Sequence, residues 1–160
     1  MVSVTNDVVV KRSADVIQNA RAKVLALQEA ILELPGSVKG DIRGNVGFPV
    51  EHHFANGVYC RKLTLPAVSY SVGKIHRYPT NNILLKGRIA IVNPEQDDDI
   101  HEAPCIWQSP GGSQRAVYAF EETIWVTTHP VDKSYTEADL DTIEAEVIVN
   151  DFEQLDRERT

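Results

Sequence analysis

From Gly73-Lys74-Ile75-His76 to Lys86-Gly87, and again at Pro110-Gly111-Gly112-Ser113-Gln114-Arg115, the chain alternates turn residues with short apolar runs. Glycine adopts positive φ angles at no steric cost, and proline lacks a backbone donor, so both residues mark the turns between strands. The two stretches therefore predict β-structure that is interrupted by tight turns.

The same pattern continues on both sides of these stretches. Short runs rich in β-branched and aromatic residues are typical of strands. The expected strands are residues 57–65, 69–76, 82–92, 103–108, 114–119 and 123–129. An acidic run, residues 95–99, is expected at a solvated hairpin tip. This number of short strands favours a jelly-roll barrel, in which a closed or doubled sheet leaves few exposed edges.

Over about residues 42–130, the chain resembles the cupin superfamily of small jelly-roll barrels, whose two motifs hold a metal ion at fixed distances from such glycines. Counting back from Gly87 and on from Gly112, the four ligand positions of those motifs fall on Lys74, His76, Thr80 and Arg115. The resemblance thus implies a mainly β, cupin-type jelly roll with a helix at each end. It also implies that three of the four usual metal ligands have been replaced.

Lysine and arginine are cationic donors and do not bind metal ions at neutral pH. A pocket built from them prefers a carboxylate, a phosphate or a nucleotide. The sequence therefore predicts a non-catalytic, electropositive pocket for a small anionic or nucleotide-like ligand, with no cofactor. The predicted ligand-binding residues are Lys74, His76, Tyr78, Thr80, Arg115 and Trp125. The alternative left open is that the cations pair with nearby carboxylates such as Glu121 or Glu122.

A second interpretation is a cupin enzyme that uses a divalent transition metal. Histidine is a common metal ligand, and His76 with either His52 or His53 and the carboxylate of Glu51 is a candidate set. Adjacent side chains on a strand point to opposite faces, so at most one of His52 and His53 can face the barrel interior. His129 is expected at the surface.

A third interpretation is a structural or assembly protein of a virion. The phrases at residues 73–76, 109–111 and 122–129 are similar to small cupin-like proteins of tailed bacteriophages. This resemblance implies a location in the host cytoplasm or in the virion.

The N-terminal third predicts a helix that Ser13 caps and Pro35-Gly36 ends. Its apolar residues follow a heptad spacing and are Ile17, Ala20, Val24, Leu27, Ile31 and Leu34. Such a stripe suits a parallel helix pair or trimer, or a helix that packs on its own barrel. Residues 1–10 are expected to form a strand that adds to a neighbour's sheet. A homodimer or homotrimer is therefore expected.

The C-terminal region predicts a second helix, with Thr136 and Asp139 in a capping box. Leu140, Ile143 and Val147 form its apolar face, and residues 155–160 are expected to fray. The chain is thus divided into residues 1–36 for oligomerisation or packing, residues 37–132 for the barrel, and residues 133–160 for an acidic helix and tail.

The composition fits one globular domain, with 160 residues, 42% hydrophobic and 24% charged. A net charge of -7 argues against nucleic-acid or anionic-membrane partners. No run approaches the roughly 20 apolar residues that span a bilayer. A cytoplasmic location is therefore expected.

Overall fold

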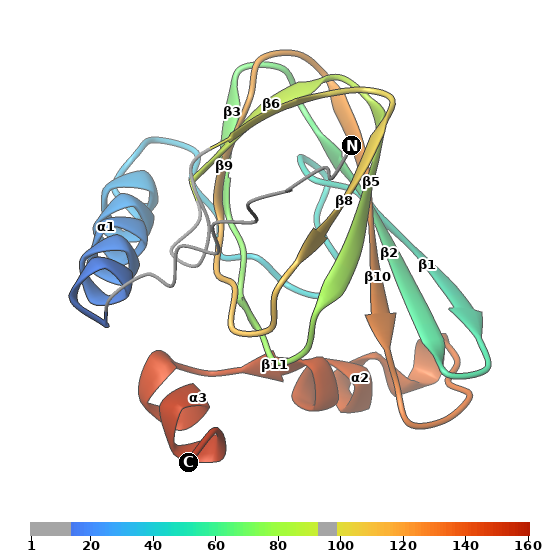
Figure 1. Cartoon of the computed structure of the whole chain (residues 1–160). Helices are drawn as coiled ribbons and strands as arrows, with labels where there is room; N and C mark the ends of the chain where they lie inside the picture. Colours follow the sequence, from blue (N-terminus) through green and yellow to red (C-terminus); the bar gives the residue numbers. More distant parts are fainter. Residues whose placement is uncertain (1–13, 93–98) are drawn as a thin grey trace, which may run out of the picture.

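Two antiparallel β-sheets face each other and form a barrel in the computed structural model, which describes residues 14–92 and 99–160 (Figure 1). The five-stranded sheet has the order β1 (Val50–Ala55), β2 (Val58–Leu65), β10 (Thr123–Pro130), β5 (Thr80–Lys86), β8 (Cys105–Ser109). The four-stranded sheet has the order β3 (Ser69–Val72), β9 (Ala116–Ala119), β6 (Arg88–Val92), β7 (Asp99–Glu102). The predicted architecture is confirmed as a mainly β barrel with helices toward both ends.

Two of the expected strands are broken at glycines. Residues 82–92 divide into β5 and β6 at Gly87, which has a φ of +96°. Residues 69–76 divide into β3 and β4 (Ile75–His76) at Gly73 and Lys74. Sequence reasoning missed β1, β7 and β11 (Ile148–Val149), which pairs with β4. Short strands such as β11 carry no periodic signal of their own, because only tertiary pairing defines them.

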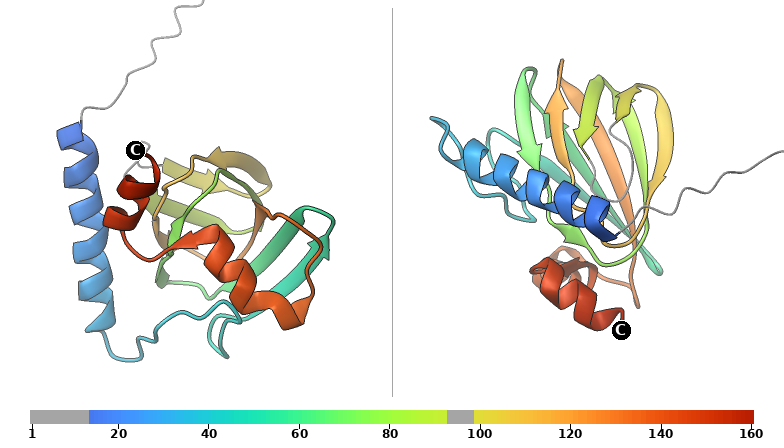
Figure 2. Two further views of the ribbon diagram at one scale, coloured as in Figure 1. Left: turned by 90° about the horizontal axis from the view of Figure 1, so that it is seen from below. Right: turned by 60° about the vertical axis from the view of Figure 1, so that its left-hand side comes forward.

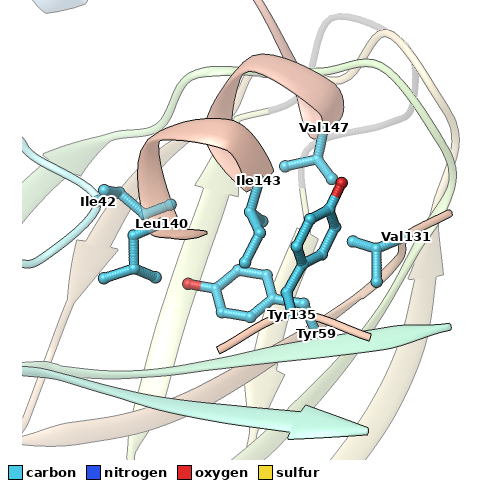
Figure 3. Close-up of a cluster of buried hydrophobic side chains, with 7 residues drawn as sticks. All are labelled: Ile42, Tyr59, Val131, Tyr135, Leu140, Ile143 and Val147. Atoms are coloured by element: carbon cyan, nitrogen blue, oxygen red, sulfur yellow. The ribbon is translucent and has the colours of Figure 1, made fainter. Parts of the chain in front are cut away.

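Two apolar clusters lie at different levels of the molecule. The first, between the sheets, consists of Leu65, Leu84, Ile89, Ile91, Val117, Ala119 and Trp125. The second, drawn in Figure 3, lies under helix α2 (Leu140–Val147) and consists of Ile42, Tyr59, Val131, Tyr135, Leu140, Ile143 and Val147. Burial of each large side chain contributes about 1.5–3 kcal/mol to folding.

Helix α2 covers one end of the barrel, as Figure 1 and the left view of Figure 2 show. The 3-10 turn η1 (Glu137–Asp139) precedes it, and the predicted capping box is present, with the Thr136 amide donating to Asp139 Oδ2 at 2.9 Å. The predicted apolar face of α2 is confirmed, because Leu140, Ile143 and Val147 are buried.

The expectation of a frayed C-terminus is wrong. Residues Phe152–Glu158 form helix α3, and Leu155 is fully buried. The Asp151 side chain caps this helix by accepting from the Gln154 amide at 2.7 Å. One buried leucine and one good cap are enough to order a short terminal helix that packs on the rest of the chain.

Helix α1 (Ala14–Leu32) includes the first described residue and ends close to Pro35-Gly36, as the sequence predicts. Its stripe faces its own chain: Val24 is fully buried, and Gln114 Nε2 donates to Gln28 Oε1 at 3.0 Å. Arg21 forms an ion pair with Asp156 of α3 at 2.9 Å. The helix therefore packs on its own barrel, while oligomerisation stays a prediction. Ser13 and the expected strand at residues 1–10 lie outside the described residues.

No helix in the described parts of the chain is both long and apolar enough to cross a membrane.

Candidate functional site

A layer of polar side chains lies inside the barrel between the two apolar clusters. Alternation along β10 produces this layer, because every second side chain faces the interior. Trp125 belongs to the first apolar cluster, Thr127 and His129 follow on the same face, and Val131, just after the strand, belongs to the second cluster. Along β2, Arg61 occupies the equivalent level. We call this set the polar layer, and its members are Arg61, His76, Thr80, Asn82, Ser109, Arg115, Thr127 and His129.

Arg115 lies at the centre of the polar layer with only 5% of its surface exposed. Its Nη1 donates to Asn82 Oδ1 and to Ser109 Oγ, both at 2.8 Å, and Nη2 lies 3.4 Å from His76 Nδ1. Its guanidinium also stands over the ring of Trp125, 5.0 Å from the ring centroid. Burial lowers the pKa of Arg115 to about 10, so the group stays charged at neutral pH.

No carboxylate of the described residues pairs with Arg115, and its Nε–H has no hydrogen-bond acceptor among them. The pairing with Glu121 or Glu122 is not seen among the described residues, where Glu122 binds Lys86 at 2.6 Å. The alternative does hold for Lys74, whose ammonium pairs with the carboxylate of Glu144. A buried cation that is solvated only by neutral groups is costly unless an anion joins it.

Asn82 organises the surroundings of Arg115 and was not anticipated from the sequence. It is completely buried, and its Oδ1 also accepts from Trp125 Nε1 at 3.2 Å and from Thr127 Oγ1 at 3.5 Å. Its Nδ2 donates to Ser109 Oγ at 3.0 Å. The available signal was asparagine inside a strand, where this residue type is depleted.

Two histidines meet beside Arg115, with the ring centroids of His76 and His129 5.0 Å apart. Burial, followed by the charge of Arg115, lowers the pKa of His129 to about 3 and that of His76 well below its ordinary value. Both rings are therefore neutral at pH 7. The expectation of a surface position for His129 is wrong, because only 4% of it is exposed and it stacks on Tyr59.

Two atoms of the polar layer are buried without a hydrogen-bond partner. They are Thr80 Oγ1 and His129 Nδ1. The register of β5 against β10 pairs Asn81 with Thr128, which brings Thr80 and His129 next to each other on the inner face. Unsatisfied buried polar atoms are rare in proteins and indicate a place that a ligand or water fills.

Arg61 is the second cation of the polar layer and was also missed. It lies on β2 opposite His52 of β1 and Thr127 of β10. Burial is the largest influence on its pKa and lowers it. Arg61 and His76 are both only partly exposed. Only the register of β2 identifies Arg61 as inward-facing.

The structure brings four of the six predicted ligand-binding residues together: His76, Thr80, Arg115 and Trp125. Lys74 and Tyr78 lie apart from them. The Lys74 ammonium pairs with Glu144 of α2, and Tyr78 is 40% exposed. Lys74 precedes the two-residue strand β4, so strand alternation does not carry it to the side of His76.

The metal alternative is not supported by the donor set. His52 faces inward, with Nδ1 2.8 Å from the Tyr59 hydroxyl, whereas His53 faces outward near Glu51. Within residues 14–92 and 99–160, no group of three or more histidine, cysteine or acidic side chains is arranged to hold a metal ion. The cation of Arg115 next to His76 also opposes a bound divalent cation. The residues present do not fit a metal.

A separate depression of about 280 Å³ lies at the rim of the five-stranded sheet. Its walls are formed mainly by residues of outer faces and turns: Gly57, Val58, Pro79, Asn81, Gln108, Thr128 and Pro130, with His129 at its base. It carries no charged side chain, and Arg115 does not line it, so the polar layer remains the stronger candidate site.

No protein-family model matches this chain, and no curated protein does. Solved structures similar to it include a cupin superfamily protein from Desulfitobacterium hafniense, with 9% identity and a TM-score of 0.47 over 59% of this chain and 84% of that one. An acetylacetone dioxygenase from Acinetobacter johnsonii has 16% identity and a TM-score of 0.47 over 64% and 79% of the two chains. An RmlC-like cupin from Shewanella frigidimarina has 14% identity and a TM-score of 0.46 over 67% and 92%.

These similar structures include cupins. None of the three comes from a bacteriophage, and the phage resemblance stays a prediction.

Proposed function

We propose that this protein is a non-catalytic, cupin-like protein that binds a small anionic or nucleotide-like ligand in its electropositive barrel. The observation that carries the proposal is the buried, charged Arg115 without a carboxylate partner in the described chain. An anion next to this guanidinium offsets the desolvation cost that neutral hydrogen bonds alone leave.

The unused donors of the site fit an anion in shape as well as in charge. The Nε and Nη2 atoms of an arginine form an edge that binds a carboxylate or phosphate through two hydrogen bonds. Here Nε makes no hydrogen bond to the described residues, and Nη2 makes only a long contact with His76. The unpaired atoms of Thr80 and His129 supply further neutral contacts.

The chemistry of the polar layer favours binding over catalysis. A general base works best when its pKa lies near the working pH. His129, with a pKa of about 3, is a weak base, and no member of the polar layer is a carboxylate or a thiol. The six predicted residues then reduce to a ligand set of His76, Thr80, Arg115 and Trp125.

The first experiment is native mass spectrometry with elemental analysis of the purified protein, followed by thermal unfolding with added inorganic phosphate. We expect phosphate to raise the Tm of the wild type and to leave that of Arg115→Gln unchanged. Lys86→Gln is the matched control, since it removes an exposed cation that pairs with Glu122. Equal phosphate stabilisation of Arg115→Gln and wild type would disprove this site, and a stoichiometric transition metal would favour an enzyme.

A second candidate function is a structural or assembly role in a virion, as a homo-oligomer of a phage-encoded protein. One observation favours it: helix α1 and the segment after it expose the apolar residues Leu25, Leu32, Leu34 and Val38. Light scattering on the wild type and on Leu25→Asp separates the two roles, because an assembly module loses its oligomer and a ligand-binding monomer does not change.

A further inference from the structure

Arg61 is a charged group for which the described chain provides no partner. Alternation along β2 fixes its direction: Tyr59 and Leu65 on the same face are buried, and Leu63 packs on the first apolar cluster, between the sheets. Arg61 therefore points into the barrel. It makes no hydrogen bond or ion pair with any described residue.

The carboxylates around Arg61 act on it only from a distance. Glu144 and Asp41 exert a favourable charge effect on Arg61 but do not contact it, and Glu144 is already paired with Lys74. Lys62, the next residue on β2, points outward and binds Glu51 at 2.8 Å. Two adjacent cations on one strand thus differ sharply: the outer one has an acid partner and the inner one has none.

Arg61 and Arg115 act on the same histidines. The positive charges of both arginines disfavour protonation of His76 and of His129. Thr127, the cross-strand neighbour of Arg61, donates to the same Asn82 oxygen that accepts from Arg115. The two guanidiniums therefore border one interior region, with only neutral groups between them.

We infer that Arg61 is a second anion-binding group of this pocket and that the ligand is a compact dianion whose two negative charges face Arg115 and Arg61. The inference rests on the proposed function. Each of the two guanidiniums carries a positive charge that no carboxylate of the described residues contacts, and one negative charge neutralises only one of them. A small dicarboxylate or a phosphate monoester carries both charges on a small frame, and a monoanion does not.

Two matched probe pairs test the charge requirement by calorimetry at pH 8. Succinate is compared with succinamate, in which an amide replaces one carboxylate, and methyl phosphate is compared with dimethyl phosphate, which keeps one charge. We expect at least one dianion to bind the wild type about tenfold or more tightly than its monoanion partner, as two charge-assisted contacts require. The pair that shows the preference identifies the ligand as a dicarboxylate or a phosphate ester.

Arg61→Gln is expected to reduce the dianion preference to about twofold and to leave the affinity for the monoanion unchanged. Arg115→Gln is expected to lower the affinity for both the dianion and the monoanion. Arg61→Lys retains a positive charge but lacks the planar guanidinium. Its dianion preference should therefore lie between that of wild type and that of Arg61→Gln. Lys62→Gln is the matched control on the same strand and should behave as wild type.

The outcomes separate the two proposals. An undiminished dianion preference in Arg61→Gln overturns the role of Arg61 and leaves the anion site intact if Arg115→Gln still loses binding. Unchanged binding in Arg115→Gln, or no binding of any of the four probes by the wild type, overturns the proposed function and the inference with it. Because Arg61 has no partner in the described chain, Arg61→Gln should be at least as stable as wild type without ligand. A marked loss of stability would assign Arg61 a structural role instead.

Discussion

At the scale of single residues, the protein buries the positive charge of Arg115 in the barrel interior, where desolvation of a charge is unfavourable. Arg115 is solvated by the amide oxygen of Asn82 and the hydroxyl of Ser109, not by a carboxylate. Hydrogen bonds to neutral acceptors stabilise a buried guanidinium, but they do not neutralise its positive charge. A carboxylate at either position would complete an internal ion pair and remove the reason to bind an anion.

Asn82 should be the most sensitive polar residue of the barrel. Replacing it by alanine leaves the Arg115 and Trp125 donors unpaired in the interior, which costs about 2–4 kcal/mol of unfolding free energy. Urea unfolding measures this change. Asn81→Ala is the control, since Asn81 is exposed on the same strand and its loss should cost less than about 0.5 kcal/mol. Equal losses in both variants would contradict the central role of Asn82.

At the scale of elements, alternation along the strands sorts side chains between the interior and the surface, and the turns decide where alternation restarts. Gly87 ends β5 and starts β6 on the opposite sheet. Its φ of +96° is unfavourable for other residues. A Cβ at this position would lie 2.8 Å from the Glu122 carbonyl oxygen and 2.3 Å from Thr123 Oγ1.

Gly87→Ala should therefore destabilise the barrel by about 2 kcal/mol or more, because both backbone strain and a collision with β10 oppose it. Thermal and urea unfolding measure the loss. Gly40→Ala is the control, as it has open space around its Cα and no positive φ angle. A Gly87→Ala variant as stable as Gly40→Ala would show that this turn relaxes without cost.

Helix α1 shows why one pattern can serve two arrangements. Apolar residues with heptad spacing form one face of a helix, and either a second helix or a sheet can cover that face. In this chain Val24 packs inward, and Gln28 accepts a hydrogen bond from Gln114, the residue before Arg115 of the polar layer. The periodicity predicted the helix and its buried face, but only the tertiary contacts identified what covers that face.

At the scale of the whole molecule, a polar layer lies between two apolar clusters within one barrel. This arrangement couples the folding of the barrel to the protonation of the two buried histidines. Both have pKa values lowered in the folded state, His129 to about 3 against 6.5 when unperturbed. The unfolded chain therefore binds more protons than the folded chain below about pH 6.5.

Stability should accordingly be highest above pH 6.5 and decline as the pH falls toward 3, with His129 contributing up to about 1.4 kcal/mol per pH unit and His76 adding to the decline. Urea unfolding between pH 6.5 and 5 measures this slope before the carboxylates titrate. His129→Asn should reduce the slope by about 1.4 kcal/mol per pH unit, and His53→Asn, which removes an exposed histidine, serves as the control. An unchanged slope in His129→Asn would contradict a buried, neutral His129.

Much of the fold could be predicted from the sequence, but only part of the candidate site. The motif spacing identified His76, Thr80 and Arg115, which the structure brings together, and Trp125 joins them through Asn82. The same counting placed Lys74 with them, although it lies at the surface with Glu144. Counting from the motif assumes that Lys74 and His76 lie on one continuous strand. The chain instead breaks at Gly73 and Lys74, between β3 and β4, so Lys74 does not share the inner face with His76.

The sequence by itself determined the local features: the strand-and-turn pattern, the capping box of Thr136 and Asp139, and the apolar face of α2. These depend on residues a few positions apart, whose propensities and hydrogen bonds act within one turn. Only the tertiary structure decided that Arg61 and His129 face the interior and that Asn82 binds Arg115, Trp125 and Thr127. Those outcomes depend on the register between strands far apart in the chain, where a shift of one residue exchanges inside for outside.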